Sequence, residues 1–229
     1  MRGNLFLWIT SSLCAYVAHA TSMSGFCNDR NATTPVVKGD QTYICININD
    51  QYRAVFAPVV DQYVQLRLYE SYTDTRIRPT NSSAAAYMTI SSMSSRSVYK
   101  QYTTAKGKAY PILTAVVSVK QGEVQGISWD DGCYLCDSTT CEANLYSTPA
   151  IPLYNSAFGD GSTCYKESPE CLNTTGLCDL AVYVGWTGTD ANGNYLSSAG
   201  MRISQFQKYS VNSYFTDFKT KLSSLLPRL

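Results

Sequence analysis

Cysteine is the residue type that most constrains how this chain can fold. Eight of its nine cysteines follow residue 20, and six of those eight lie between residues 133 and 178, among glycine, proline, serine and threonine. In an exported chain, an even number of cysteines predicts disulfides rather than free thiols. The residues expected to be bonded in this way are Cys27, Cys45, Cys133, Cys136, Cys141, Cys164, Cys171 and Cys178.

The first twenty residues have the pattern of a secretion signal. Arg2 precedes an apolar stretch, and Ala18 and Ala20 place small residues where signal peptidase cleaves. An uncleaved membrane anchor is the alternative, but polar residues interrupt this stretch, which is shorter than the roughly 20 apolar residues of a spanning helix. We therefore expect cleavage after Ala20 and a secreted, extracellular protein whose remaining cysteines are oxidised.

Cys133 and Cys136 have the Cys-x-x-Cys spacing, which has two possible interpretations besides structural disulfides. Such a pair can be half of a zinc site, or it can be a redox-active dithiol. An oxidising compartment favours disulfides instead, and no βαβ pattern of a redox protein surrounds the pair. We expect Cys27 to bond to Cys45, because both lie far from the other six cysteines, and those six to pair among themselves.

Histidine is missing from the chain after the expected signal, because the only one is His19. The chain then lacks the commonest general base and metal ligand, and we predict neither a metal nor a cofactor. Removal of Arg2 leaves 17 basic residues against 17 acidic ones, whereas a nucleic-acid-binding protein would normally be basic. No later apolar segment is long enough to span a membrane, so we expect neither nucleic acid nor membrane insertion.

Short segments with alternating side chains, separated by turn residues, predict a mainly β fold. Residues 112–119 form a continuous apolar run rich in β-branched side chains, which indicates a central strand buried on both faces. Together these segments predict a disulfide-stabilised, β-sandwich-like domain with a cysteine-rich loop region. Further strands are expected at 42–46, 64–68, 87–90, 98–103, 123–129, 180–187 and 195–203.

The segment 52–64 is ambiguous, because its apolar residues recur at helical spacing while Pro58 falls inside the pattern. A proline in the interior of a helix costs about 3 kcal/mol. We therefore favour two strands that meet near Pro58, and a helix is the alternative.

The C-terminal segment has an apolar stripe at helical spacing that ends before Pro227. We divide the chain into a signal peptide at 1–20, a β-rich extracellular domain at 21–205 with a cysteine-rich segment at 133–178, and an amphipathic helix at 206–229 packed on that domain. A helix that binds a partner is the alternative. The stripe consists of Phe215, Phe218, Leu222, Leu225 and Leu226.

Without histidine, hydrolysis would have to use carboxylates, as glycosidases do, and acidic residues follow two of the tryptophans. The simpler interpretation is structural, because Asp, Asn and Gly also end strands and build hairpin turns. Asp190, Asn192 and Asn194 alternate like oxygen ligands of a calcium loop, but the closing glutamate of such a loop is missing. The candidate binding residues are Trp129, Asp130, Asp131, Trp186, Asp190 and Asn192.

Three Asn-x-Ser/Thr triplets, at Asn31, Asn81 and Asn173, predict N-glycosylated surface loops. Tyrosine and serine are abundant, as on many contact surfaces. We therefore expect a non-catalytic binding or structural module whose partner is an extracellular protein or glycan. The alternatives are a carboxylate-based hydrolase of extracellular polysaccharide and a shortened ectodomain of a membrane receptor-type protein.

Overall fold

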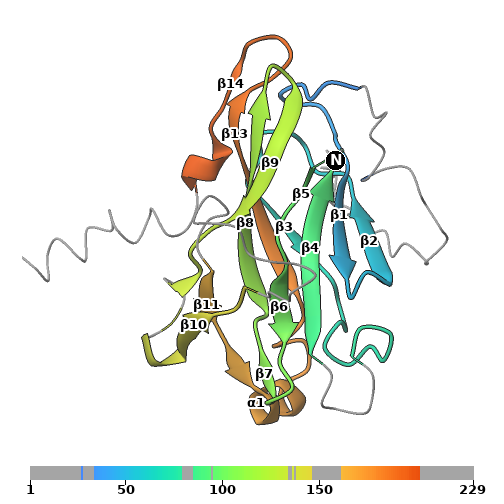
Figure 1. The fold of residues 1–229 in the computed structure, drawn as a ribbon, viewed down its shortest axis with the longest axis vertical. Coiled ribbons are helices and arrows are strands. Elements are labelled where there is room, and N and C mark those ends of the chain that lie inside the picture. The colour runs from blue at the N-terminus through green and yellow to red at the C-terminus, as the bar shows by residue number, and fades with distance from the viewer. Residues whose placement is uncertain are drawn as a thin grey trace, which may run out of the picture.

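Two β-sheets face each other in the computed structural model of this chain (Figure 1). The structure describes residues 27, 34–78, 85–93, 95–133, 136, 138–145 and 161–201. The expected signal peptide at 1–20, the expected helix at 206–229 and the triplets at Asn31 and Asn81 lie outside these residues. The prediction of a disulfide-stabilised, mainly β domain is confirmed.

The larger sheet has seven strands, and every pairing in it is antiparallel. Its strand order is β12-β7-β6-β4-β1-β2, and β5 pairs with β4 outside this path. The strands are β1 (Ile44–Ile48), β2 (Tyr52–Phe56), β4 (Ala86–Ser92), β5 (Ser95–Arg96), β6 (Lys100–Thr103), β7 (Lys108–Ala109) and β12 (Lys166–Glu167).

The second sheet has five strands: β3 (Val64–Arg67), β8 (Ile112–Lys120), β9 (Glu123–Trp129), β13 (Ala181–Thr189) and β14 (Tyr195–Leu196). The order is β14-β13-β8-β9, and β3 also pairs with β13. The β8–β13 pairing is parallel and covers eight residue pairs, whereas the other pairings in this sheet are antiparallel. The topology therefore brings together two segments that lie more than 60 residues apart.

Shorter elements complete the described part of the chain. Strands β10 (Cys141–Ala143) and β11 (Ser162–Cys164) form a separate two-stranded sheet. The helix α1 (Ser168–Asn173) follows β12, and the 3₁₀ helices η2 (Ser138–Thr140) and η4 (Ser198–Met201) precede β10 and follow β14. These elements lie at the margins of the two large sheets (Figure 1).

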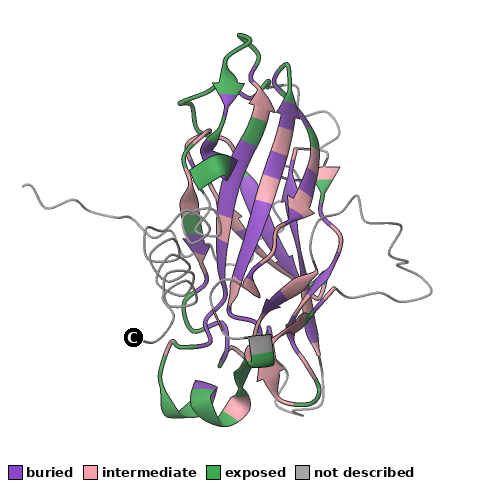
Figure 2. Cartoon of the chain, turned by 90° about the vertical axis from the view of Figure 1, so that its left-hand side faces the viewer, coloured by how far each residue is buried: buried purple, intermediate pink, exposed green. Residues whose placement is uncertain are grey.

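One hydrophobic core joins the two large sheets, and the buried strand positions in Figure 2 mark it. The core takes Ile46 and Ile90 from the larger sheet and Val117 and Val184 from the other. Burial of a side chain of this size contributes about 2 kcal/mol. Trp129 also lies in the core, and its Nε1 donates a hydrogen bond to the carbonyl oxygen of Val98 at 2.8 Å.

Several strand predictions are confirmed in detail. Strand β9 has the predicted bounds, and β8 and β13 contain the predicted segments 112–119 and, from Ala181 onward, 180–187. The helical alternative for 52–64 is wrong, because Pro58 lies in the connection between β2 and β3. The short strand predicted at 87–90 is longer, since β4 pairs with β6 from Ala86, with β1 from Met88 and with β5 up to Ser92.

The prediction of a long strand at 195–203 is wrong. Strand β14 ends at Leu196, and η4 begins two residues later. Hydrogen bonds from the side chain of Asp61 explain this change of direction, because its Oδ1 accepts from the backbone N–H of Ser197 at 2.6 Å and of Ser198 at 2.8 Å. The side chain of Ser198 in turn accepts a hydrogen bond from the N–H of Trp186 at 3.0 Å.

Gly188 lets β13 approach β8 closely at the end of their parallel pairing. Its φ is +104°, and a Cβ at this position would lie 1.8 Å from the carbonyl oxygen of Val119. Gly193, in the following turn, has a φ of +81° but nothing within 4 Å of such a Cβ. The two glycines therefore share a positive φ but differ in available space.

Replacement of these glycines by alanine tests how tightly β8 and β13 are packed. We expect Gly188→Ala to lower the free energy of unfolding by at least about 3 kcal/mol, because the backbone of β8 would have to move. Gly193→Ala should cost only about 1–2 kcal/mol, the penalty for a left-handed alanine. Urea unfolding followed by tryptophan fluorescence measures both, and equal losses would contradict the close approach at Gly188.

Candidate functional site

The two tryptophans predicted to bind a ligand do not reach the surface. Trp129 and Trp186 are among the largest fully buried side chains of the described residues, and both belong to the core between the sheets. Neither ring can therefore serve as a platform for a sugar. The sequence did not distinguish these positions because inward and outward residues alternate along a strand, and only the register decides which face is covered.

The candidate carboxylates lie at opposite ends of the five-stranded sheet. Asp130 follows β9, and its N–H donates to the carbonyl oxygen of Thr114 near the start of β8. Asp190 follows Gly188, which pairs with Val119 near the end of β8. The five steps along the strand from Thr114 to Val119 span about 17 Å, which exceeds the separation of a glycosidase carboxylate pair.

Asp131 has a local structural role beside Asp130. Its Oδ1 accepts a hydrogen bond at 2.8 Å from the N–H of Cys133, two residues further along the chain. This contact turns the chain after β9, as the sequence suggested for Asp130-Asp131-Gly132. The structure thus brings together Trp129, Asp130 and Asp131 at one strand end, but it does not bring Asp190 to them.

Asp190 holds the β13–β14 hairpin to the N-terminal part of the described chain. Its Oδ1 accepts hydrogen bonds from the N–H groups of Asn192 at 2.9 Å and Asn194 at 2.7 Å. Its Oδ2 accepts from the N–H of Lys38 and from Nδ2 of Asn194, both at 3.0 Å. This carboxylate therefore accepts hydrogen bonds from four donors. Asp190 stabilises the turn and is not arranged as a calcium ligand.

The same contacts govern the charge of Asp190. Burial of the carboxyl raises its pKa, but the hydrogen bonds from Asn194, Lys38 and Asn192 outweigh burial and lower the pKa to about 2. Among the described residues, no group of three or more histidine, cysteine, aspartate or glutamate side chains is arranged to hold a metal ion.

We expect the stabilisation by Asp190 to disappear in acid. Because the folded pKa lies below the ordinary value of about 3.9, the contribution is complete above about pH 5 and is lost as the pH falls toward 2. The stability difference between the unmodified chain and Asp190→Asn should therefore shrink between pH 5 and pH 2. Denaturant unfolding at several pH values measures it, and a difference independent of pH would contradict the assigned hydrogen bonds.

All eight expected cysteines are bonded. The pairs are Cys27–Cys45, Cys133–Cys141, Cys136–Cys164 and Cys171–Cys178, so the first pair and the pairing of the other six among themselves are as expected. Bonded sulfurs offer neither a zinc ligand set nor a redox-active thiol.

A cluster around Glu142 ties the small β10–β11 sheet to the larger sheet. The Nζ of Lys108 donates to Oε2 of Glu142 at 2.6 Å, and the hydroxyl of Tyr110 donates to Oε1. Burial opposes ionisation of Glu142, but these two hydrogen bonds hold its pKa below its usual range. Both carboxylate oxygens of Glu142 thus accept hydrogen bonds, which indicates that Glu142 has a structural role.

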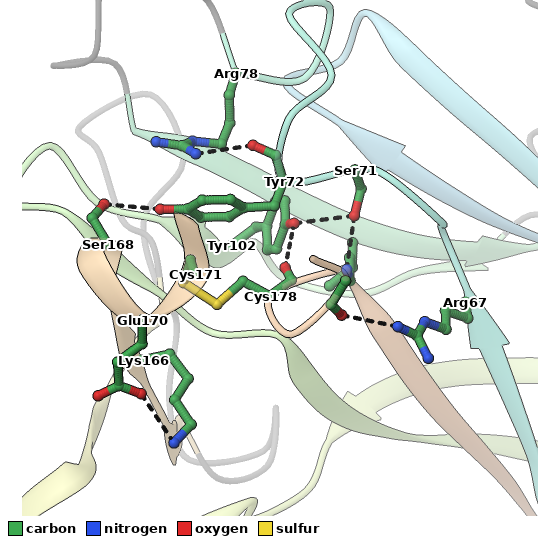
Figure 3. Close-up of a disulfide and its surroundings, with 12 residues drawn as sticks. Arg67, Ser71, Tyr72, Arg78, Tyr102, Lys166, Ser168, Glu170, Cys171 and Cys178 are labelled. Atoms are coloured by element: carbon green, nitrogen blue, oxygen red, sulfur yellow. Dashed lines mark hydrogen bonds and ion pairs between the residues drawn. A yellow bond between two sulfur atoms is a disulfide. The ribbon is translucent and has the colours of Figure 1, made fainter. Parts of the chain in front are cut away.

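A disulfide and several hydrogen bonds anchor the Cys171–Cys178 loop (Figure 3). The hydroxyl of Tyr102 donates to the carbonyl oxygen of Cys178 at 2.7 Å and lies 3.0 Å from Oγ of Ser71. Ser71 Oγ also accepts from the N–H of Leu180 at 2.8 Å. Burial raises the pKa of Tyr102 above its usual range, so its hydroxyl keeps the proton that it donates to the loop.

Further contacts fix both sides of this loop. At its start, the hydroxyl of Tyr72 lies 2.8 Å from Oγ of Ser168, and the guanidinium of Arg78 lies 3.9 Å from the centre of the Tyr72 ring. At its end, Nη2 of Arg67 donates to the carbonyl oxygen of Gly176 at 2.9 Å. Figure 3 shows the Tyr72 side chain above the disulfide and Arg67 to the right of it. The backbone of the loop is therefore held in one conformation.

This anchored loop displays apolar side chains to solvent. Leu172 is 70% exposed and Leu177 is 39% exposed, and each is adjacent to one cysteine of the disulfide. Tyr69 is 66% exposed, and its ring lies 5.0 Å from the guanidinium of Arg67, which also bonds to the loop. We call Tyr69, Leu172 and Leu177 the loop surface. These three exposed apolar side chains are the candidate site for contact with a partner.

Sequence reasoning missed the loop surface, although a local signal was present. The segment from Cys171 to Cys178 has a leucine next to each cysteine and polar residues between them. A short disulfide-closed loop cannot bury both leucines beneath itself. Asn173, the predicted glycosylation site in this loop, ends α1 and is exposed.

Comparison with known proteins identifies a family. A family model described as "Uncharacterised protein DDB_G0273449" matches residues 72–223, about two thirds of the chain. The chain belongs to this family. The match to the DDB_G0273449 family contains β4 to η4 and the whole Cys171–Cys178 loop, whereas β1, β2 and β3 precede it.

No curated protein and no solved structure matches the chain. Among the described residues, no helix is long and apolar enough to cross a membrane. The DDB_G0273449 family member is thus a disulfide-rich β domain of the kind typical of extracellular proteins.

Proposed function

We propose that this chain is a secreted, non-catalytic binding module that recognises a protein partner through the loop surface. The observation that carries the proposal is the exposure of Leu172 and Leu177 on a loop fixed by a disulfide and by hydrogen bonds from Tyr102 and Arg67. A surface that is already ordered loses little conformational entropy when it binds.

The chemistry of the loop surface favours a protein over a glycan. Leucine side chains offer no hydrogen bonds, whereas sugar hydroxyls need donors and acceptors. Two nearby charged groups are engaged, since Arg67 bonds to Gly176 and Glu170 lies 3.2 Å from Lys166. One face of the Tyr69 ring lies under the guanidinium of Arg67, so it is less available for stacking on a sugar.

Secretion and glycosylation belong to the same proposal. The N-terminal signal pattern and four disulfides support export into an oxidising compartment. We propose N-glycans at Asn31, Asn81 and Asn173. A glycan on Asn173 would border Leu172 and limit the directions from which a partner approaches.

The hydrolase alternative has no support from the positions of its residues. Asp130 and Asp190 lie at opposite ends of the five-stranded sheet, and the two tryptophans that would bind sugar are in the core. The ectodomain alternative is compatible with the same binding role, since a receptor-type protein could present the loop surface equally well.

A double substitution in the loop surface tests the proposed function. We expect the tagged chain to bind a protein on an array of purified extracellular proteins. Leu172→Ser combined with Leu177→Ser should weaken that binding at least about tenfold, which corresponds to about 1.4 kcal/mol. The measurement is the dissociation constant by surface plasmon resonance.

Tyr195→Ser is the matched control, because Tyr195 is 79% exposed and lies at the opposite end of β13 from the loop. It should leave the dissociation constant unchanged. If the double variant binds as tightly as the control, or if the chain binds a glycan array instead, the loop surface is not the protein-binding site. Equal thermal unfolding of the variants shows that the fold is intact.

A further inference from the structure

The outward face of the five-stranded sheet carries no charge over β13, β8 and β9 apart from Lys120 and Glu123, which pair with each other at the hairpin end of β8 and β9. Val182, Val184 and Trp186 point into the core, so their neighbours along β13 point outward. The register places outward residues of β8 and β9 beside them. These outward positions are Ala181, Tyr183, Gly185, Thr187, Ile112, Thr114, Val116, Ser118, Gly126 and Ser128.

Such a face is unusual for a sheet that faces water. Antiparallel sheets with one solvated side place polar and charged residues there, whereas a strand that is apolar on both faces is covered on both. Strand β8 places two apolar side chains, Ile112 and Val116, on the face away from the core, where they alternate with Thr114 and Ser118. Two outward side chains, Thr114 and Ala181, are buried. A covering element is therefore expected on this face.

The described chain ends on this same face. A Cβ on Gly185 would lie 2.7 Å from Cα of Ala199, so η4 sits directly over the outward side of β13. The hydrogen bond from the N–H of Trp186 to Oγ of Ser198 holds it there. Figure 1 shows η4 beside β13, on the side away from β1 and β4. The chain after Met201 thus begins against the uncharged face.

We propose that the C-terminal segment 206–229 docks its apolar stripe on the outward face of β8, β9 and β13. The stripe of Phe215, Phe218, Leu222, Leu225 and Leu226 needs an apolar surface if it forms a helix. A helix over residues 214–226 would be about 20 Å long, and the nine residues of β8 span about 30 Å. The stripe therefore fits along the strand.

Two observations favour this segment over a separate partner. Thirteen residues, 202–214, connect Met201 to the stripe, so the stripe is held near the face at high effective concentration. The family match extends to residue 223 and includes Phe215, Phe218 and Leu222, so most of the stripe belongs to the matched region. The proposed contact lies on the sheet face and is independent of the loop surface and its function.

Site-specific photo-crosslinking tests the docking. Benzoylphenylalanine in place of Val116, in the complete chain at low concentration, should crosslink within one molecule to the peptide that contains Leu222. The same probe in place of Val55, on the edge strand β2 of the other sheet, should not reach that peptide. Crosslinks between two molecules, or none to residues 206–229, would overturn the proposal.

A second variant separates docking from general unfolding. Phe218→Asp combined with Leu222→Asp should abolish the crosslink from position 116 and increase the binding of a hydrophobic dye, because the sheet face becomes exposed. Lys219→Glu combined with Lys221→Glu changes charge in the same segment and should do neither. If the aspartate variant keeps the crosslink, or if the lysine variant loses it, the apolar stripe does not hold the segment in place.

Discussion

The parallel pairing of β13 with β8 is the interaction on which the rest of the structure depends. Eight consecutive residue pairs join the two strands, and β13 is also bonded to β3 near its beginning and to β14 near its end. Residues of both strands enter the core that faces the larger sheet. A parallel pair needs a long connection, and here that connection contains the disulfide-bonded segment between β9 and β13.

Both ends of β13 determine what the molecule can present to a partner. The Cys171–Cys178 loop enters the strand and is fixed by Tyr102 from the larger sheet and by Arg67 from β3. At the other end, the Asp190 turn and η4 fold back onto the sheet. Rigidity at the loop therefore comes from the sheets beneath it, which is why exposed leucines can be held there in one arrangement.

Much of the fold was predictable because it is encoded locally. The alternation at 180–187, the apolar run at 112–119 and the aspartate turn at Asp190 depend only on neighbouring residues. The parallel register between β8 and β13 is not local, and it sets the position of the buried Trp186, whereas the register between β8 and β9 sets that of the buried Trp129. The sequence placed the candidate site at the two tryptophans because it does not reveal these registers. The leucines beside Cys171 and Cys178 could have been identified from the sequence alone.

Hydrogen exchange of backbone amides is the most direct test of the central role of β13. If the β8–β13 pairing holds the domain together, the amides of Tyr183, Gly185 and Thr187, which lie on the β8 side of β13, should exchange only through global unfolding, with the same free energy as the amides of β8. Edge amides in β2 and β14 should exchange through smaller openings. Exchange in β13 that is as fast as in β14 would contradict the central role of this strand.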